Sequence, residues 1–160
     1  MSMERAKAHL SALGLQDRVM EFRVSSATVA LAAEAVGCLP ENIIKTLSFE
    51  NGDGALLILA SGTARIDNGK FKARFGRKAK MLSPERVEPL VGHGIGGVCP
   101  FGVNPEVEIY LDESVRGLEP VYPACGTPAS AVRLTVDELV RASGALGWVD
   151  VTKKSEETTI

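Results

Sequence analysis

A lysine inside an apolar strand is the first residue whose type and position could do chemistry. Residues 44–49 are typical of a β-strand, and side chains alternate across a strand, so Lys45 shares one face with Leu47 and Phe49. A lysine is rarely buried without a partner, because desolvating its ammonium is costly. Lys45 therefore either reaches water at the strand end or lies at the mouth of an apolar cleft, where it would bind a carbonyl, carboxylate or phosphate. The opposite face carries Ile44, Thr46 and Ser48.

A glycine-rich segment from Gly92 to Gly102 is the second candidate, with five glycines in eleven residues. Glycines let the main chain approach a ligand closely and direct N–H groups at an oxygen atom. Gly92, Gly94 and Gly97 match the spacing of the dinucleotide fingerprint, but that motif follows a strand and opens a helix. This segment instead follows an expected helix and runs into Pro100. The alternative is an ordinary connection, although connections of this kind in compact domains are usually functional.

The cysteines and histidines permit a third kind of chemistry. Cys99 follows His93 by six residues, which suggests a thiol nucleophile with a histidine base. Such a pair needs spatial contact and an orienting group that the sequence does not require, so the alternative is a small buried residue. Cys38 and Cys125 are interpreted as structural, and three cysteines without metal-ligand spacing indicate reduced thiols. Because His9 and His93 are the only histidines, a histidine-based metal cluster is excluded, and we expect no metal or cofactor.

Length and composition indicate one folded domain. The chain has 160 residues, of which 45% are hydrophobic and 24% charged, enough to bury a sizeable core. The longest apolar run, residues 55–60, is far shorter than the roughly 20 residues that a membrane-spanning helix needs. The first residues carry no apolar signal segment. We expect one domain over residues 1–152, a mobile tail over 153–160, and a soluble cytoplasmic protein.

The net charge of −2 conceals a basic stretch. Between Arg65 and Arg86, eight basic and two acidic residues give a local charge of +6, which leaves −8 for the rest of the chain. Such a patch attracts an anionic partner while the remaining surface repels it, although a solvated helix face is the alternative interpretation. The cations expected to contact phosphates are Lys70, Lys72, Arg74, Arg77, Lys78 and Lys80.

The elements that must position these residues are predicted from periodicity and helix caps. Helices are expected over residues 3–15, 28–36, 68–75, 83–91 and 135–143. Strands are expected over residues 44–49, 55–61, 107–111, 130–134 and 146–151. Because helices and strands do not alternate regularly, we expect an α+β domain rather than a doubly wound sheet.

Four segments of the chain together resemble the YbaK/EbsC family, the prolyl-tRNA-synthetase-associated editing domain, over roughly residues 20–152. They are ATVALAAEAVG at 27–37, IIKTL at 43–47, GIGGVCPFG at 94–102 and AVRLTVDEL at 131–139. The lysine strand combined with the Gly-Gly-x-x-Pro-x-Gly loop is more specific than either piece alone. The resemblance implies a mixed sheet or partial barrel flanked by helices, with a cleft for the 3′ end of an aminoacyl-tRNA.

The function that the resemblance implies is a freestanding deacylase of translation quality control. It would hydrolyse the ester between a tRNA, typically proline tRNA, and a wrongly attached small amino acid. Lys45 matches the family's functional lysine, whereas Ala124 and Cys125 stand where many relatives carry a serine before the glycine, which puts a serine contribution in doubt. The residues expected to bind the substrate are Ser26, Thr28, Gly96, Gly97, Val98, Cys99, Pro100 and Gly126.

The chemistry of ester hydrolysis agrees with these residue types. Main-chain N–H groups of a glycine-rich loop can stabilise the tetrahedral oxyanion without a protein nucleophile. Lys45 would add positive charge near the ester or the terminal ribose. No general base is visible, so we expect water to attack with help from groups of the substrate.

The expected partner is tRNA, with an aminoacyl-tRNA synthetase as a further candidate and no membrane; the protein would be a monomer or homodimer. The alternatives are a non-catalytic tRNA- or aminoacyl-binding module, a Cys99-dependent hydrolase and, last, a nicotinamide-dependent oxidoreductase.

Overall fold

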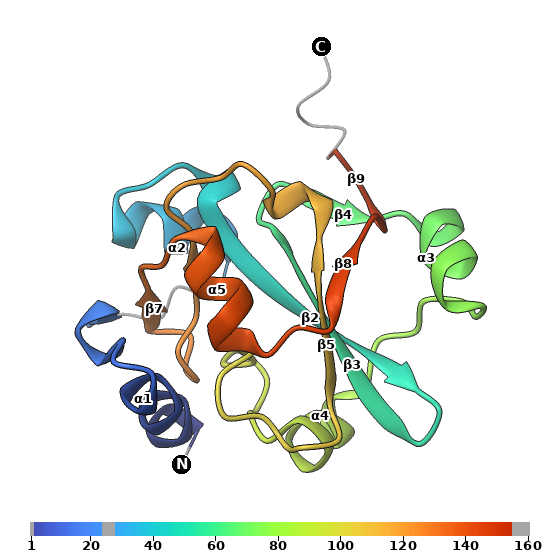
Figure 1. Ribbon diagram of the computed structural model, residues 1–160, viewed down its shortest axis with the longest axis horizontal. Helices are drawn as coiled ribbons and strands as arrows, with labels where there is room; N and C mark the ends of the chain where they lie inside the picture. The colour runs from blue at the N-terminus through green and yellow to red at the C-terminus, as the bar shows by residue number, and fades with distance from the viewer. Residues whose placement is uncertain (1, 24–27, 155–160) are drawn as a thin grey trace.

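The computed structural model describes residues 2–23 and 28–154 and has a mixed β-sheet at its centre (Figure 1). The strand order in this sheet is β6–β2–β3–β5–β8; β2 and β3 are antiparallel and the other neighbours are parallel. The five strands are β2 (Ile43–Asn51), β3 (Gly54–Ser61), β5 (Glu108–Asp112), β6 (Tyr122–Pro123) and β8 (Gly147–Val149). Two small antiparallel ladders join β1 (Val19–Glu21) to β7 (Ser130–Val132) and β4 (Ala64–Ile66) to β9 (Thr152–Lys154).

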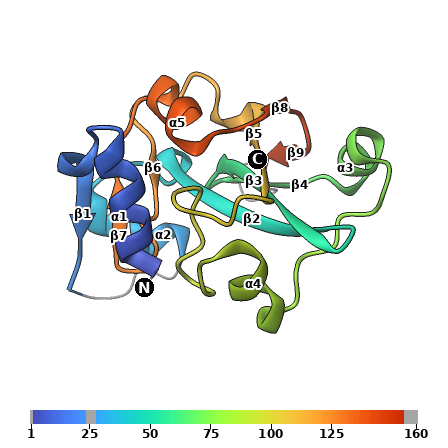
Figure 2. The ribbon, with the colours of Figure 1, turned by 60° about the horizontal axis from the view of Figure 1, so that its bottom comes forward.

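Helices cover both faces of the central sheet (Figures 1 and 2). They are α1 (Ser2–Ala12), α2 (Val29–Val36), α3 (Asn68–Phe75), α4 (Pro84–Val91) and α5 (Val136–Ser143). Leu10 of α1, Val87 of α4 and Leu139 of α5 belong to the larger hydrophobic core on one face. Phe71 of α3 belongs to a smaller core on the opposite face. The sheet thus separates two apolar layers.

The burial of β3 explains why its sequence is an uninterrupted apolar run. Leu57 and Leu59 pack in the larger core, whereas Leu56 and Ile58 pack in the smaller one. A strand that is buried on both faces has no position at which a polar side chain would reach water. The neighbouring strand β2 lies nearer the edge, and its residues 45–47 are only partly buried.

The α+β fold class is confirmed, and so are the predicted helices, with shifts at their ends. Local signals explain this success: the Asp67 carboxylate accepts from the Lys70 N–H at 3.0 Å, and Thr135 and Glu138 form a capping box. The strands β1, β4, β6 and β9 were not predicted. Strand β9 also corrects the expected tail boundary, because Lys153 and Lys154 pair with β4, while residues 155–160 lie outside the described residues. No helix in the described part of the chain is long and apolar enough to cross a membrane.

Candidate active site

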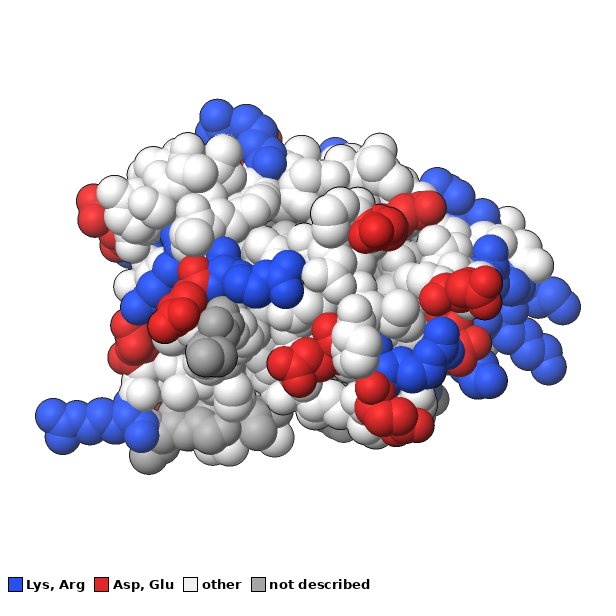
Figure 3. All heavy atoms as spheres, turned by 90° about the horizontal axis from the view of Figure 1, so that it is seen from below, with Lys and Arg blue, Asp and Glu red and all other residues white. Residues whose placement is uncertain are grey.

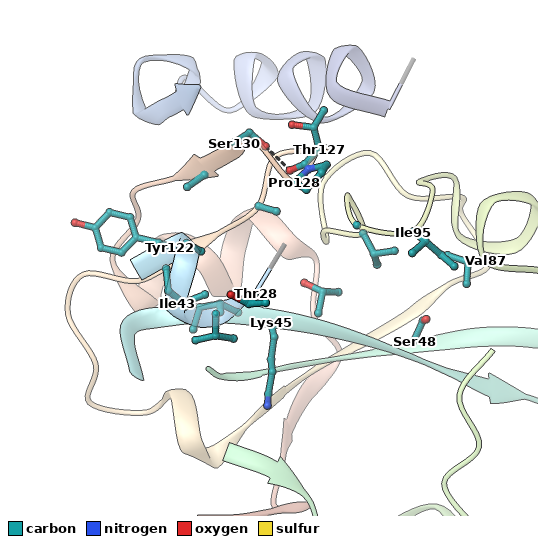
Figure 4. Close-up of a pocket in the computed structure, with 18 of the residues that line it drawn as sticks. Thr28, Ile43, Lys45, Ser48, Val87, Ile95, Tyr122, Thr127, Pro128 and Ser130 are labelled. Atoms are coloured by element: carbon teal, nitrogen blue, oxygen red, sulfur yellow. Dashed lines mark hydrogen bonds between the residues drawn. The ribbon is translucent and has the colours of Figure 1, made fainter. Parts of the chain in front are cut away.

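A cavity of about 370 Å³ opens beside β2 (Figure 4). Its walls come from β2, the N-terminal part of α2, the start of α4, the glycine loop after α4 and the segment from β6 to β7. Small-molecule sites usually measure roughly 300–1,000 Å³, so this cavity suits a small ligand rather than a polymer. Its lining is Thr28, Val29, Ala32, Ile43, Ile44, Lys45, Thr46, Ser48, Met81, Leu82, Val87, Ile95, Gly96, Val98, Tyr122, Ala124, Thr127, Pro128, Ser130 and Ala131.

The lining is mainly apolar, and its polar side chains are hydroxyls together with one lysine. No carboxylate, imidazole or thiol of the described residues belongs to it. Some of the hydroxyls already have partners: the Thr28 Oγ1 caps α2 by accepting from the Leu31 N–H at 3.1 Å. The Ser130 hydroxyl donates to the Thr127 carbonyl at 2.9 Å and accepts from the Cys125 N–H at the same distance.

Lys45 lies on β2 at the border of this cavity. Its neighbours on the strand alternate as expected: Ile44 belongs to the larger core, while Leu47 and Phe49 belong to the core on the α3 side. Figure 4 shows the Lys45 side chain leaving β2 on the side away from Ile95 and Thr127, with its ammonium directed away from the glycine loop. The prediction that Lys45 shares a face with Leu47 and Phe49 is therefore confirmed.

No described residue pairs with the ammonium of Lys45. Lys45 is half-buried and forms no hydrogen bond or ion pair with another described residue. Burial lowers the pKa of Lys45 below the usual lysine value, because removal from water penalises the charged form. An unpartnered lysine that is partly withdrawn from water is poised to attract a negatively charged or strongly polar group of a ligand.

The glycine loop docks on the turn between β6 and β7 through main-chain contact. A Cβ on Gly97 would lie only 2.2 Å from the Gly126 carbonyl oxygen, so only glycine fits at this crossing. Gly96 has a φ of +89° and faces the ring of Pro128. The Gly97 N–H donates to the Gly94 carbonyl at 3.0 Å and is thus already used within the loop. Gly96 and Val98 line the cavity; Gly97 and Gly126 hold the two walls together behind it.

Cys99 and His93 are in contact, but their surroundings disfavour a catalytic pair. The Cys99 Sγ lies 3.5 Å from the His93 Nε2, and both side chains are fully buried outside the cavity lining. The His93 Nε2 lies 2.6 Å from the Phe101 carbonyl, to which it donates, and the Nδ1 accepts from the Ser2 hydroxyl at 2.5 Å. The Nε2 therefore has no free lone pair for the thiol proton. Burial raises the pKa of Cys99 to about 12, so the thiol is inert at neutral pH.

Comparison with known proteins agrees with this geometry. The model of the aminoacyl-tRNA editing domain family matches residues 24–142. This chain belongs to the aminoacyl-tRNA editing domain family. It is 46% identical over 157 residues to the uncharacterised protein YwhH of Bacillus subtilis (strain 168), covering 98% of this chain and all of YwhH. A crystal structure described as that of a candidate trans-editing enzyme for prolyl tRNA synthetase has a TM-score of 0.86 and 37% identity, covering 95% of this chain and 97% of the other.

A part of much larger synthetases is also similar. The proline–tRNA ligase of Thermotoga sp. (strain RQ2) is 30% identical over 93 residues, which is 58% of this chain but only 16% of the ligase. The similarity to these ligases therefore concerns one segment of them and not the whole enzyme. Together the findings support an editing role for the present domain.

The editing-domain fold brings together some of the predicted site residues and separates others. Thr28, Lys45, Gly96 and Val98 meet at the cavity, while Cys99 and Pro100 are buried away from its lining. Ser26 lies outside the described residues. The sequence analysis did not single out several lining residues, namely Thr46, Ser48, Ile95, Tyr122, Thr127 and Pro128. Only Thr46 and Ser48 gave a usable signal, since they alternate with apolar residues on the strand that carries Lys45.

The predicted phosphate-binding cations lie around α3, apart from the cavity. Figure 3 shows Lys and Arg side chains gathered at the α3 end of the molecule, with acidic side chains among them. Several are engaged: the Lys70 Nζ lies 3.1 Å from the Asp150 Oδ1, and the Lys80 Nζ lies 3.7 Å from the Glu50 Oε2. The Arg74 guanidinium stacks 5.0 Å from the centre of the Phe75 ring. Of the predicted cations, Lys72, Arg77 and Lys78 are exposed and have neither an ion pair nor a ring contact with another described residue.

Proposed function

We propose that this protein is an aminoacyl-tRNA deacylase that acts in trans and hydrolyses the ester of mischarged tRNA, with a small amino acid on proline tRNA as the substrate. The observation that carries the proposal is a small, mainly apolar cavity in a chain of the editing-domain family, bordered by the half-buried Lys45, which has no partner among the described residues. The cavity would hold the aminoacyl group and the adjoining ribose. The synthetase-related names of two relatives support proline tRNA as the carrier.

The position of Lys45 supports a role toward the terminal nucleotide. The cavity receives Thr46 and Ser48 from one face of β2, whereas the Lys45 ammonium leaves on the opposite face, which Leu47 and Phe49 share with Phe71 of α3. A tRNA end that places its aminoacyl group in the cavity and crosses the edge of β2 would bring its ribose or phosphate to Lys45. Lys72, Arg77 and Lys78, which have no ion pair with another described residue, belong to the same side of the sheet, where they would add sequence-independent phosphate contacts.

The proposed reaction uses water as the nucleophile. Water attacks the ester carbonyl carbon, the carbonyl electrons move to oxygen, and collapse of this tetrahedral oxyanion expels the ribose oxygen. The oxyanion would be stabilised by loop N–H groups of Gly96 and Val98, which border the cavity. The lining offers no carboxylate or imidazole as a base, so a vicinal ribose hydroxyl or the amino acid itself would relay the proton of the attacking water to the leaving oxygen.

The absence of a base from the described lining also favours a second candidate, a module that binds aminoacyl-tRNA without turnover. The deciding experiment is release of amino acid from proline tRNA charged with Ala, Cys, Ser or Pro. Lys45→Ala should lower kcat/KM by about tenfold to a hundredfold, as expected for loss of a hydrogen bond from a charged group, chiefly through KM. Lys154→Ala, which removes an exposed lysine on β9, is the matched control and should act as wild type.

The outcomes separate the two candidates. Selective turnover that depends on Lys45 supports the deacylase. Tight binding of the charged tRNAs with no release of amino acid from any of them supports the binding module. Full activity of Lys45→Ala would refute the role given to this lysine.

A further inference from the structure

The outer edge of β2 is open where it faces the cavity. Strand β6 pairs only with Ile43 and Ile44, and the next outer neighbour is Met81, which bridges to Phe49. Between these two contacts the described structure gives the outer side of β2 no strand partner. Thr46 lies at the middle of this gap.

Strand geometry determines which main-chain groups are exposed there. The Ser48 carbonyl accepts from the Leu82 N–H at 3.1 Å, and the Glu50 N–H donates to the Lys80 carbonyl at 2.8 Å; both bonds are on the outer side of β2. The main-chain groups of successive residues in a strand point to alternate sides. The N–H and C=O of Thr46 therefore also point outward, into the gap.

The side-chain hydroxyl of Thr46 is the next polar group at this edge. Its Oγ1 is shielded from water and has no hydrogen-bond partner in the described part of the chain, although Thr46 belongs to the cavity wall. Buried polar groups nearly always have a partner, because leaving one unpaired is costly. Ser48 lines the cavity two residues further on the same face, so the wall on this side is polar. A ligand that reaches this hydroxyl from the cavity would supply its missing partner.

The chemistry of the wall indicates which group of an aminoacyl ligand meets Thr46. A charged α-ammonium placed against a dry hydroxyl would be costly, because the lining has no carboxylate to compensate it. A neutral side-chain hydroxyl can both donate to and accept from the Thr46 Oγ1 without that cost. The ammonium then remains near the open mouth, where water solvates it.

We propose that Thr46 is a specificity-determining residue whose Oγ1 forms a hydrogen bond with a side-chain hydroxyl of the aminoacyl group. The inference rests on the proposed deacylase function and deepens it by naming a small hydroxyl-bearing amino acid as the preferred substrate. Discrimination has two parts: a seryl group pairs with Thr46, whereas an alkyl group of the same size leaves the Thr46 hydroxyl unpaired. Thr46 binds and selects, and it takes no part in breaking the ester.

The test compares proline tRNA charged with serine or with 2-aminobutyrate, in which a methyl group replaces the hydroxyl. Wild type should favour the seryl ester in kcat/KM by on the order of tenfold to a hundredfold, the range expected for one buried hydrogen bond and its unpaired counterpart. Thr46→Val keeps the shape of the side chain and should abolish this preference. Its kcat/KM for the seryl ester should fall to that for the 2-aminobutyryl ester, which should stay within about threefold of the wild-type value. Thr46→Ser, which keeps the hydroxyl, should retain the preference. Thermal unfolding of each variant checks that the fold is intact.

The results distinguish the inference from the function on which it rests. Equal loss of both activities in Thr46→Val, or no preference in wild type, overturns the role of Thr46 while leaving the deacylase in place. If wild type hydrolyses neither ester but releases Ala or Cys from proline tRNA, the preference for a hydroxyl is refuted and the deacylase stands. If it releases no amino acid from any of these tRNAs, the deacylase fails, and binding of adenosine carrying seryl or 2-aminobutyryl in a 3′-amide linkage decides about Thr46. In that binding experiment, tighter binding of the seryl compound by wild type, lost in Thr46→Val, supports the inference. Equal affinities of wild type for the two compounds refute it.

Discussion

The main-chain contact between the glycine loop and the β6–β7 turn makes a sharp prediction for Gly97→Ala. A Cβ at this position would lie 2.2 Å from the Gly126 carbonyl oxygen and 2.5 Å from its carbon. Ordinary contacts of a Cβ begin at 3.4 Å, so the two segments would have to separate by about 1.2 Å. Both partners are main chain, and neither can rotate out of the way. The substitution must therefore displace one wall of the cavity relative to the other.

The size of this displacement sets the expected effect. Overpacking of a close contact costs about 1–3 kcal/mol. For a domain of this length each kcal/mol lowers Tm by about 2–4 °C, so Gly97→Ala should unfold about 2–12 °C below wild type. A shift of about 1 Å in a binding wall lowers catalysis by about a hundredfold, which is the loss expected in deacylation kcat/KM.

The matched control lies three residues earlier in the same loop. A Cβ at Gly94 would have the Glu88 Oε1 at 3.9 Å as its nearest neighbour, and the φ of Gly94 is not in the left-handed region. Gly94→Ala should keep the wild-type Tm and activity. Differential scanning calorimetry and the deacylation assay are measured on both variants. A Gly97→Ala protein as stable and active as Gly94→Ala would refute the argument that the glycine crossing holds the cavity walls.

Two further predictions concern the cysteines and the cations. Iodoacetamide at pH 8 should modify Cys38 slowly, because its thiol is only half-buried although burial raises its pKa as well. Cys99 and Cys125 should stay unmodified, because both are fully buried and burial raises their pKa values to about 12 and about 11. Cys38→Ser should remove the labelling and leave any deacylation unchanged. Mass spectrometry that finds rapid alkylation of Cys99 would contradict this, as would loss of activity on blocking the thiols. Affinity for tRNA should fall steeply with salt, and replacing Lys72, Arg77 and Lys78 together by alanine should lower the magnitude of the slope of log K against log salt by about 2–3. A wild-type affinity that does not change with salt would exclude this surface as the docking site.

The parts of the fold that were predictable are those that local chemistry determines. Asn68–Phe75 is flanked by a capping aspartate and a terminal glycine, so its bounds follow from adjacent residues alone. Strand β6, in contrast, has only two residues, Tyr122 and Pro123, and pairing with the distant β2 defines it. No local pattern marks such a strand. For the same reason the sequence did not predict that Lys153 and Lys154 continue the fold by pairing with β4.

For the candidate site too, local patterns predicted one part, and the part that depends on distant contacts was not predicted. Alternation on one strand was enough to place Lys45 on the face of Leu47 and Phe49. Alternation could not predict that the cavity lies on the opposite face of β2, because the position of the cavity depends on where the glycine loop and the β6–β7 turn pack. The sequence therefore drew attention to the lysine and passed over Thr46, although the two residues are adjacent and face the two sides of the same strand.

The glycines of the loop have a structural use that the sequence analysis did not predict. Their expected use was to direct N–H groups at a substrate oxygen, yet the Gly97 N–H is taken by the Gly94 carbonyl. Position 97 requires glycine because the main chain of Gly126 passes close to it. Position 126 requires glycine because the main chain of Ser2 and Met3 passes close to it. These contacts connect α1, the β6–β7 turn and the glycine loop in a continuous stack of main chain behind the cavity. In the proposed function, recognition of the ligand would then fall to residues that line the cavity itself, among them Gly96, Val98 and Thr46.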